Sequence, residues 1–342
     1  MRVLLIAVTA LCLSIFGPAK AAEVGLPDLA SGVVTLRVVH AVNPRLNKIS
    51  DVEVQTLLTQ TSRTVKTYFG IDLKFERQPD TTVEAILAKV PPGAFAARRG
   101  EIYDFKTDTG DPARIVTALT KQMIKYRISF DDALDYAGPY LVAKPADKTL
   151  AGMAQAIATT HLKRLEHWKN LKTASGQSVI DQSHANEFIV WDLAGYGDLP
   201  YDLIVTNQLV ASAEYADADI SASLRGGVST GATSYSKSGR FKAYAFISTF
   251  PFVEPGSIPK ALGGVPDRAQ AVRLAGQYAA HEIGHLLLHL GHPYANPACV
   301  MRSAQVLDYI AWAHDLDPAK CKLGSSLAMT PGAAKIEYRP DW

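Results

Sequence analysis

The sequence has few cysteines, no excess of either charge and no long run of basic residues. Three Cys in 342 residues are too few for a disulfide-dense mini-protein. With 35 Lys and Arg against 33 Asp and Glu, the formal net charge is +2, and no basic stripe could follow a phosphate backbone. Nucleic acid is therefore not an expected partner. Hydrophobic residues make up 48% of the chain, which excludes a disordered protein and allows a sizeable core.

An apolar stretch near the amino terminus, Val3 to Phe16, is too short to cross a bilayer, which needs about 20 helical residues. Arg2 precedes it, and a Gly17-Pro18 break and the small-residue sequence Ala19-Lys20-Ala21 follow it. This order is typical of a secretory signal peptide over residues 1–21; the alternative is an uncleaved anchor. We therefore expect an exported protein, periplasmic or secreted, with no stable membrane anchor after signal cleavage.

Cleavage after Ala21 would remove one of the three cysteines, Cys12, and leave Cys299 and Cys321. It would also leave 33 basic and 33 acidic side chains, so the exported chain would be formally neutral. In an oxidising compartment we expect the two remaining cysteines to form one disulfide that closes a carboxyl-terminal loop. The alternative, a thiolate metal ligand, lacks the close C-x-x-C spacing of zinc ribbons.

The first part of the exported chain has the pattern of a strand, a helix and a second strand. Val33 to Val42 alternates and is rich in β-branched residues, which predicts a half-buried strand. A helix is expected over residues 51–69, with Ser50 as its N-cap and Gly70 at its end. Its expected buried face carries Val52, Leu57 or Leu58, Val65 and Phe69. A strand over residues 71–76 would complete a parallel βαβ unit.

Residues 81–187 differ from the flanking segments in their hydrophobic pattern, which predicts a mostly helical insertion with helices near residues 115–126 and 150–168. His161 and His167 lie six residues apart on different faces of the second helix, so we interpret them as ordinary surface or packing residues. Nothing in this segment indicates catalytic chemistry.

Strand patterns return after the insertion, at residues 188–192, 201–205 and 243–250. Between the last two, residues 221–238 are rich in Gly, Ser and Thr, which predicts a bulged edge strand. Such an edge could receive an extended peptide as an added strand, or it could be a plain surface hairpin.

The residues that indicate chemistry follow in a helix that opens near Pro266 and Asp267. Val272, Ala275, Ala279, Ile283, Leu286 and Leu290 form its apolar stripe. His281 and His285 lie off this stripe and are one helical turn apart, so both imidazoles can bind the same ion.

The sequence His281-Glu282-Ile283-Gly284-His285 is an H-E-x-x-H motif. Two neutral imidazoles hold Zn²⁺ in this motif, and the carboxylate between them is placed to take a proton from the metal-bound water. We therefore predict one catalytic Zn²⁺, with His281 and His285 as ligands and Glu282 as the catalytic general base.

A catalytic zinc usually has three protein ligands and one open position, and His289 and His292 compete for the third place. On an unbroken helix both are too far from His281. Gly291 can end the helix, and Pro293 prevents its continuation, so His292 can turn back toward the metal. We favour His292, with His289 as a packing residue.

The motif resembles the signature of the metzincin clan of zinc metallopeptidases, H-E-x-x-H-x-x-G-x-x-H followed by a methionine turn. Cys299-Val300-Met301 is similar to the Cys-x-Met turn of archaemetzincins and matrixins. The resemblance implies that Met301 lies beneath the metal without binding it. It also implies a zincin-like α+β fold, in which a twisted mixed sheet is backed by one helix and ends in an edge strand above the cleft, a last strand and the metal-binding helix.

The chain departs from this signature in one place, because Leu288 stands where the family has glycine and the third histidine comes one residue late. An alternative resemblance is to IrrE and ImmA-like peptidases, whose gluzincin-type arrangement has an acidic third ligand. Asp308, Asp315 and Glu337 are the candidates under that interpretation. The export signal and the Cys-Val-Met turn favour the metzincin resemblance.

The resemblance implies an upper subdomain of residues 22–80 and 188–292, the insertion at 81–187, and a lower subdomain of residues 293–342 with a helix over 304–313. The expected function is an exported zinc endopeptidase whose partner is a peptide or protein substrate. A secreted zinc-binding protein without activity, or hydrolysis of a non-peptide amide, remains as an alternative. Tyr294 and Tyr309 are near the site in sequence and are the candidates for stabilising the transition state.

Overall fold

The computed structural model describes the chain from residue 33 onward, with gaps. The described residues are 33–102, 104, 106–107, 111–125, 127–138, 141–173, 175–210, 231–232, 244–253, 267–288, 290, 292–293, 296–302, 309–324 and 333–335. The predicted signal peptide at 1–21 lies outside these residues. No helix within the described ranges has both the length and the apolar character that crossing a bilayer requires.

A mixed sheet forms the centre of the fold. Its strands are β1 (Val33–Val42), β2 (Asp72–Arg77), β4 (Leu203–Thr206), β5 (Gly231–Ala232) and β6 (Tyr244–Ser248), in the order β2-β1-β4-β6-β5. All neighbours are parallel except β5, which is antiparallel to β6 at the edge, and the short β3 (Thr81–Thr82) also pairs with β1. The parallel pair β1 and β2, with a helix between them, confirms the predicted βαβ unit. The α+β class is confirmed in this general form.

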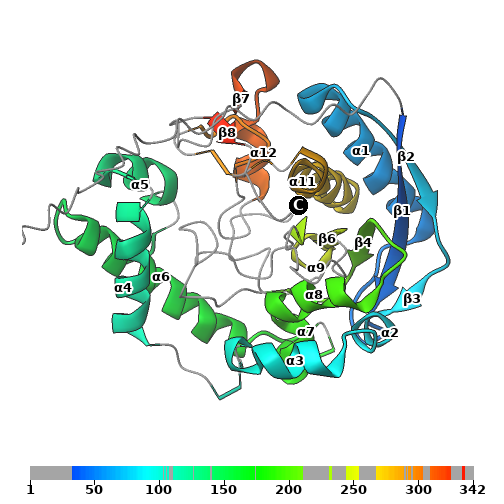
Figure 1. Cartoon of the computed structure of the whole chain (residues 1–342), viewed down its shortest axis with the longest axis horizontal. Coiled ribbons are helices and arrows are strands. Elements are labelled where there is room, and N and C mark those ends of the chain that lie inside the picture. The colour runs from blue at the N-terminus through cyan, green and yellow to red at the C-terminus, as the bar shows by residue number, and fades with distance from the viewer. Residues whose placement is uncertain are drawn as a thin grey trace, which may run out of the picture.

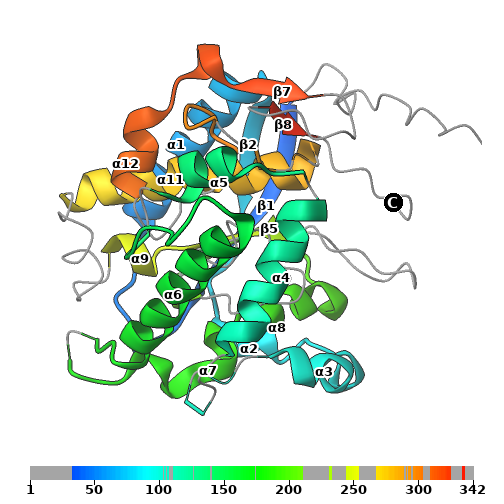
Figure 2. The same cartoon turned by 90° about the vertical axis from the view of Figure 1, so that its left-hand side faces the viewer.

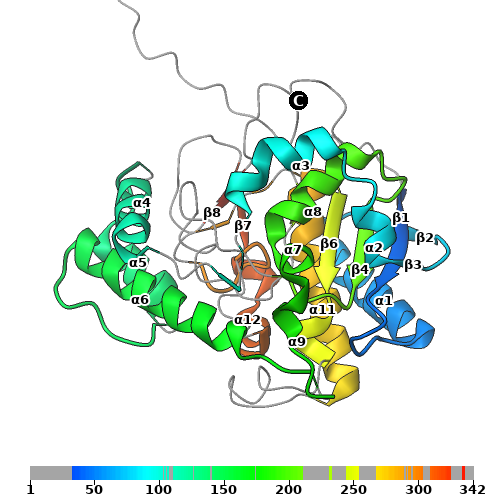
Figure 3. The same ribbon diagram turned by 90° about the horizontal axis from the view of Figure 1, so that it is seen from below.

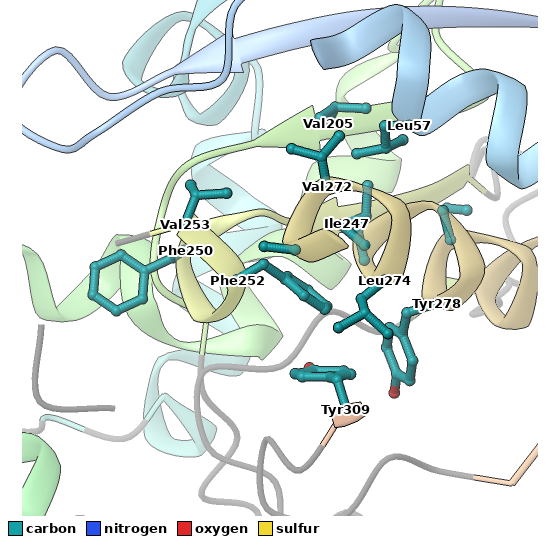
Figure 4. Packing of buried hydrophobic residues seen from close by; sticks show 14 of the residues in the cluster. Leu57, Val205, Ile247, Phe250, Phe252, Val253, Val272, Leu274, Tyr278 and Tyr309 are labelled. Atoms are coloured by element: carbon teal, nitrogen blue, oxygen red, sulfur yellow. The ribbon is translucent and has the colours of Figure 1, made fainter. Parts of the chain in front are cut away.

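Helices cover both faces of the sheet, as Figure 1 shows. Alternate strand residues point to opposite sides. Val38 and Val205 join the large core formed with helices α1 (Asp51–Phe69) and α11 (Arg268–Leu288). Val39 and Ile204 join a second core formed with α2 (Val83–Leu87) and α8 (Phe188–Ala194). Figure 4 shows Leu57, Val205 and Val272 at the junction of α1, the sheet and α11. The sheet is therefore the middle layer of three.

Helix α1 has the boundaries that the sequence predicts. Ser50 and Glu53 form a capping box at its start, and Gly70 ends it in the left-handed conformation with φ of 73°. The expected Val52 is not on the buried face: its side chain is 76% exposed, whereas Val54 is fully buried. The true stripe starts at Val54 and runs through Leu57 and Leu58, and position 52 lies about 200° away from position 54 around the helix.

Helix α11 lies directly against α1, and the contact is close because one residue has no side chain. A Cβ on Gly276 would lie 2.5 Å from the Leu57 carbonyl oxygen and 2.8 Å from the Gln60 Cβ. The Thr61 hydroxyl donates a hydrogen bond to the Gly276 carbonyl at 3.0 Å across the same contact. Asp267 begins the helix, since its carboxylate accepts from the Gln270 N–H at 2.7 Å. The predicted start of this helix is confirmed.

The region predicted as a helical insertion does contain helices, but its first residues belong to the sheet layers. β3 pairs with β1, and Val83 and Ile86 of α2 lie in the second core. The remaining helices are α3 (Pro92–Arg98), α4 (Pro112–Lys125), α5 (Phe130–Ala137), α6 (Leu150–Lys169) and the short α7 (Ser183–Asn186).

Three of these helices, α4 to α6, share a core of their own, which includes Leu119, Met123 and Ile157. They stand to one side of the sheet in Figures 1 and 3, and Figure 2 shows α4 and α6 side by side. His161 is buried in α6 and His167 is exposed, and neither lies in the metal-binding group described below.

The prediction of a strand at residues 188–192 is wrong, because these residues form the start of α8. Every residue from Ile189 to Ala194 is buried, so the segment shows neither a helical nor an alternating pattern, and an apolar run of this length fits either structure. Trp191 holds α8 against the sheet, because its Nε1 donates to the Ala185 carbonyl at 2.9 Å and its ring stacks on Phe246 of β6. The predicted strands at 201–205 and 243–250 are confirmed as β4 and β6.

Two predictions are only partly within the described residues. Of the edge strand expected at 221–238, Gly231–Ala232 forms β5 at the predicted edge, and the rest lies outside the described residues. Of the helix expected at 304–313, residues 303–308 lie outside them, and α12 (Tyr309–Asp315) ends two residues later than predicted. The other short elements are α9 (Phe250–Val253), β7 (Lys322–Gly324) and β8 (Ala333–Lys335).

Gly276→Ala is expected to destabilise the fold by about 1–3 kcal/mol, because the added methyl group meets backbone and α1 cannot shift without disturbing the sheet. Urea unfolding measures this change. Gly93→Ala is the matched control, since a Cβ at Gly93 in α3 has nothing within 4 Å. Equal stability of the two variants would contradict the close contact of α1 with α11.

Glu53→Gln tests the ion pair that joins the first turns of α1 and α11. Arg268 donates to the Glu53 carboxylate at 3.1 Å, and these contacts, Arg268 first and then Ser50, lower the pKa of Glu53 from 4.5 to about 2. Because the folded pKa lies below the unfolded value, the carboxylate stabilises the fold above pH 4.5, and this contribution is lost as the pH falls toward 2.

The partly exposed pair should contribute about 1 kcal/mol, so Glu53→Gln should lower the free energy of unfolding by that amount at pH 7. The difference from the native chain should shrink as the pH falls below 4.5. Glu166→Gln, at an exposed position of α6, is the control. A difference that stays constant from pH 7 to acid would rule out the ion pair as its source.

Candidate metal centre

Three histidines meet at the carboxyl-terminal end of α11. His281 and His285 project from this helix one turn apart, as the motif predicts, and the helix ends at Leu288. The N–H of Leu290 then bonds to the Gly284 carbonyl at 3.3 Å, so the chain turns back along the helix. This turn brings His292 to the other two histidines.

The three Nε2 atoms form a small triangle. They are separated by 3.0 Å between His281 and His285, 3.2 Å between His285 and His292, and 3.3 Å between His281 and His292. Three nitrogens bound to one tetrahedral ion at 2.0–2.1 Å would be about 3.3 Å apart. The observed triangle therefore fits one tetrahedral ion, and these side chains could hold it.

The hydrogen bonds of Nδ1 decide the tautomer of His281 and of His285, and therefore which ring nitrogen can bind an ion. His281 Nδ1 lies 2.8 Å from the Val300 carbonyl oxygen, and His285 Nδ1 contacts the Leu290 carbonyl oxygen. A carbonyl can only accept, so each Nδ1 carries the proton and each Nε2 of the neutral ring presents a lone pair. Lone pairs pointed at one another repel, and a shared cation converts that repulsion into attraction.

The three ligand positions differ in burial. His281 is fully buried, whereas His285 and His292 are half-buried. The sequence stripe places His281 off the apolar face of the helix, but α11 is covered on that side as well, so the ring is not exposed. Of the three histidines, His281 is therefore shielded from solvent, whereas solvent can reach His285 and His292.

Glu282 lies next to His281 in α11 and is fully buried. It is not a member of the metal-binding group, which the described residues form from His281, His285 and His292. The structure therefore places Glu282 in the same helical turn as His281 and His285, while the group of atoms that could share one ion consists of the three histidines.

Tyr278 is a residue near the site that the sequence analysis missed. Its ring stacks on that of His281, with centroids 4.9 Å apart and an interplanar angle of 10°. Tyr309 and Trp312 of α12 pack edge-on against Tyr278, and Figure 4 shows Tyr309 close below it. The signal was present, because a residue three positions before His281 shares its helix face.

Met301 packs against the motif helix at Gly284. A Cβ on Gly284 would lie 2.3 Å from the Met301 Sδ and 2.9 Å from Phe69 Cζ, so glycine alone allows both side chains this close. Met301 is fully buried. The methionine therefore lies against the helix that carries the H-E-x-x-H motif, and its predicted place beneath a metal ion stays a prediction.

Other candidate residues have different surroundings. Asp315 pairs with Arg302 at 3.3 Å and lies outside the histidine group. Tyr309 is buried in the aromatic cluster formed with Tyr278 and Phe252. His289, Tyr294, Asp308 and Glu337 lie outside the described residues.

The two remaining cysteines form the predicted disulfide. Cys299 and Cys321 are bonded to each other across 22 residues of sequence, so they are not metal ligands. Closing a loop of this length typically adds about 3 kcal/mol of stability.

Comparison of the chain with protein-family models, with curated proteins and with solved structures finds no match.

The identity of the third ligand can be tested by zinc binding. We expect the native chain to bind one equivalent of Zn²⁺ and His292→Ala to bind it more than about a hundredfold more weakly, because a directly bound imidazole is lost. Titration against a chromophoric chelator measures the affinity. His314→Ala, at a side chain that is 88% exposed, should leave the affinity unchanged. Undiminished affinity in His292→Ala with a loss in Asp315→Ala would support the acidic third ligand instead.

Proposed function

We propose that the protein is an exported, zinc-dependent endopeptidase of the metzincin type. The observation that carries the proposal is the triangle of three Nε2 atoms at 3.0–3.3 Å, with the Nδ1 atoms of His281 and His285 on backbone carbonyls. Catalytic zinc sites commonly have three protein ligands, and the H-E-x-x-H spacing is that of zinc peptidases. His281, His285 and His292 would hold the ion.

The donor set favours zinc over harder ions. Three neutral imidazoles suit Zn²⁺ and other late divalent metals, whereas Mg²⁺ and Ca²⁺ prefer oxygen ligands. When bound, Zn²⁺ would polarise the scissile carbonyl and lower the pKa of a coordinated water. The partly exposed His285 and His292 leave the outer side of the group as the side on which a substrate would arrive.

Glu282 would act as general base and then as general acid. Its carboxylate would take the proton from the attacking water and return it to the leaving amine nitrogen. Its place in α11 between His281 and His285, outside the group of three histidines that could share one ion, suits a side chain that moves protons and does not bind the metal. Tyr278 would keep the His281 ring in one plane by stacking on it.

The arrangement around the histidines also supports the metzincin resemblance. The edge strand β5 is antiparallel to β6, and both strands contact the motif helix α11. Met301 packs against Gly284, which is the fourth residue of the H-E-x-x-H motif. These two contacts support the edge strand above the cleft and the methionine beneath the metal that the resemblance implies. A peptide or protein that lies along this edge is the proposed substrate.

Glu282→Gln is the decisive variant, since it keeps the size of the side chain and removes its basicity. Cleavage of a mixed quenched-peptide library should fall by about two to four orders of magnitude at equal zinc content. Glu166→Gln, at the exposed position in α6, should retain full activity.

Two outcomes would contradict the proposal. Full activity of Glu282→Gln would remove this residue from the chemistry. Absence of cleavage by the native chain, with zinc bound and no exchangeable position on the ion, would favour a zinc-binding protein without activity, because hydrolysis needs an open position.

A further inference from the structure

The deepest of the three histidines depends on a distant part of the chain. His281 Nδ1 is held by the Val300 carbonyl, 19 residues away, whereas His285 Nδ1 is held by the Leu290 carbonyl only five residues away. The second contact is local, since Leu290 lies in the turn that directly follows α11. The first contact exists only while the turn at residues 298–302 stays against the helix.

That turn, here called the 298–302 turn, is joined to residues 317–321 at several points. Cys299 is bonded to Cys321 next to Val300, and the Asp317 N–H donates to the Ala298 carbonyl at 2.9 Å. The Arg302 N–H donates to the Cys299 carbonyl at 2.9 Å, which closes the turn itself. Of these connections, only the disulfide is covalent. Cys299 directly precedes Val300, whose carbonyl holds His281.

Side-chain contacts hold the other end of the same turn. Met301 fits against Gly284, and the Trp312 Nε1 donates to the Arg302 carbonyl at 2.8 Å. Cys299, Val300 and Met301 are all fully buried. The turn is thus fixed on both sides of Val300, by the disulfide before it and by packing after it.

We propose that Cys299 and Cys321 are positioning residues for the metal site, and that their disulfide raises metal affinity by holding the Val300 carbonyl on His281. This inference rests on the proposed zinc site and adds a dependence on the oxidation state of two cysteines. A histidine ligand whose second nitrogen loses its acceptor becomes less basic and free to rotate, and such a loss typically costs 10–100-fold in metal affinity. The hydrogen bonds from Asp317 and Trp312 remain, so the lower end of this range is expected.

The test is zinc affinity of the full chain, measured by competition with a chromophoric chelator. The double variant Cys299→Ser, Cys321→Ser should bind zinc about tenfold more weakly than the native chain. Glu53→Gln is the matched control, because it destabilises the fold at the far end of α11 and touches neither the turn nor the histidines. Its zinc affinity should remain within about twofold of the native value.

Cobalt substitution adds a readout that loss of stability alone would not move. With Co²⁺ in place of Zn²⁺, the visible absorption spectrum of the double variant should differ from that of the native chain if the His281 ring has changed its orientation. An unchanged cobalt spectrum and unchanged zinc affinity in the double variant would overturn the proposal, and the disulfide would then be a staple for stability only.

If the double variant does not fold, the native protein can be reduced after folding. A trialkylphosphine takes the oxygen of one water to become the phosphine oxide, the sulfur–sulfur bond breaks, and the two protons of the water give two thiols. The same drop in zinc affinity should follow removal of the phosphine, and reoxidation should restore it. Unchanged affinity of the reduced chain would overturn the proposal. Failure of the native, oxidised chain to bind zinc at all would instead contradict the proposed function.

Discussion

The close packing of α11 against its neighbours is the constraint on which the rest of the structure depends. Gly276, Ala280 and Gly284 follow one another at intervals of four, so they form a single stripe of small residues along the helix. Gly276 admits the backbone of α1, Ala280 packs with Val65, and Gly284 admits Phe69 and Met301. Larger side chains would separate the two helices and carry the histidines away from the turn that holds one of them.

The same packing explains why the site combines rigidity with access. The helix face that carries His281 is covered by aromatic residues of α12 through Tyr278, and the 298–302 turn supplies an acceptor. His285 lies in the last turns of the helix and His292 beyond its end, and both are partly exposed. The group therefore combines one buried histidine with two that lie near solvent, and backbone carbonyls hold the Nδ1 atoms of His281 and His285.

Much of the local structure could be predicted from the sequence, since the relevant signals are local. Ser50 and Gly70 mark the two ends of α1 at the predicted residues. The β-branched residues and the alternating pattern of β1 predict its strand. The one-turn spacing of His281 and His285 places their imidazoles together in any helix. The return of His292 also followed from local chemistry, because Gly291 and Pro293 do not continue a helix.

The remaining features depend on tertiary packing and left no local pattern. Helix α8 is buried on all sides, so its sequence carries no periodicity and predicts a strand as readily as a helix. Val52 is apolar yet exposed, because it lies on the wrong side of α1 for the sheet. The contact of His281 with Val300 joins residues whose sequence separation gives no hint of it.

The separate core of α4, α5 and α6 has a consequence for the order in which the chain folds. The contacts that form this core lie within about one-sixth of the chain, so the entropy lost in closing their loops is small. β1, in contrast, must find β4 across 165 residues, with this helical group lying between them in sequence. An early-folded helical group shortens the flexible part of that loop and favours the long-range pairing. These helices, which contribute no residue to the histidine group, would therefore speed the closing of the sheet against which the histidine-bearing helix packs.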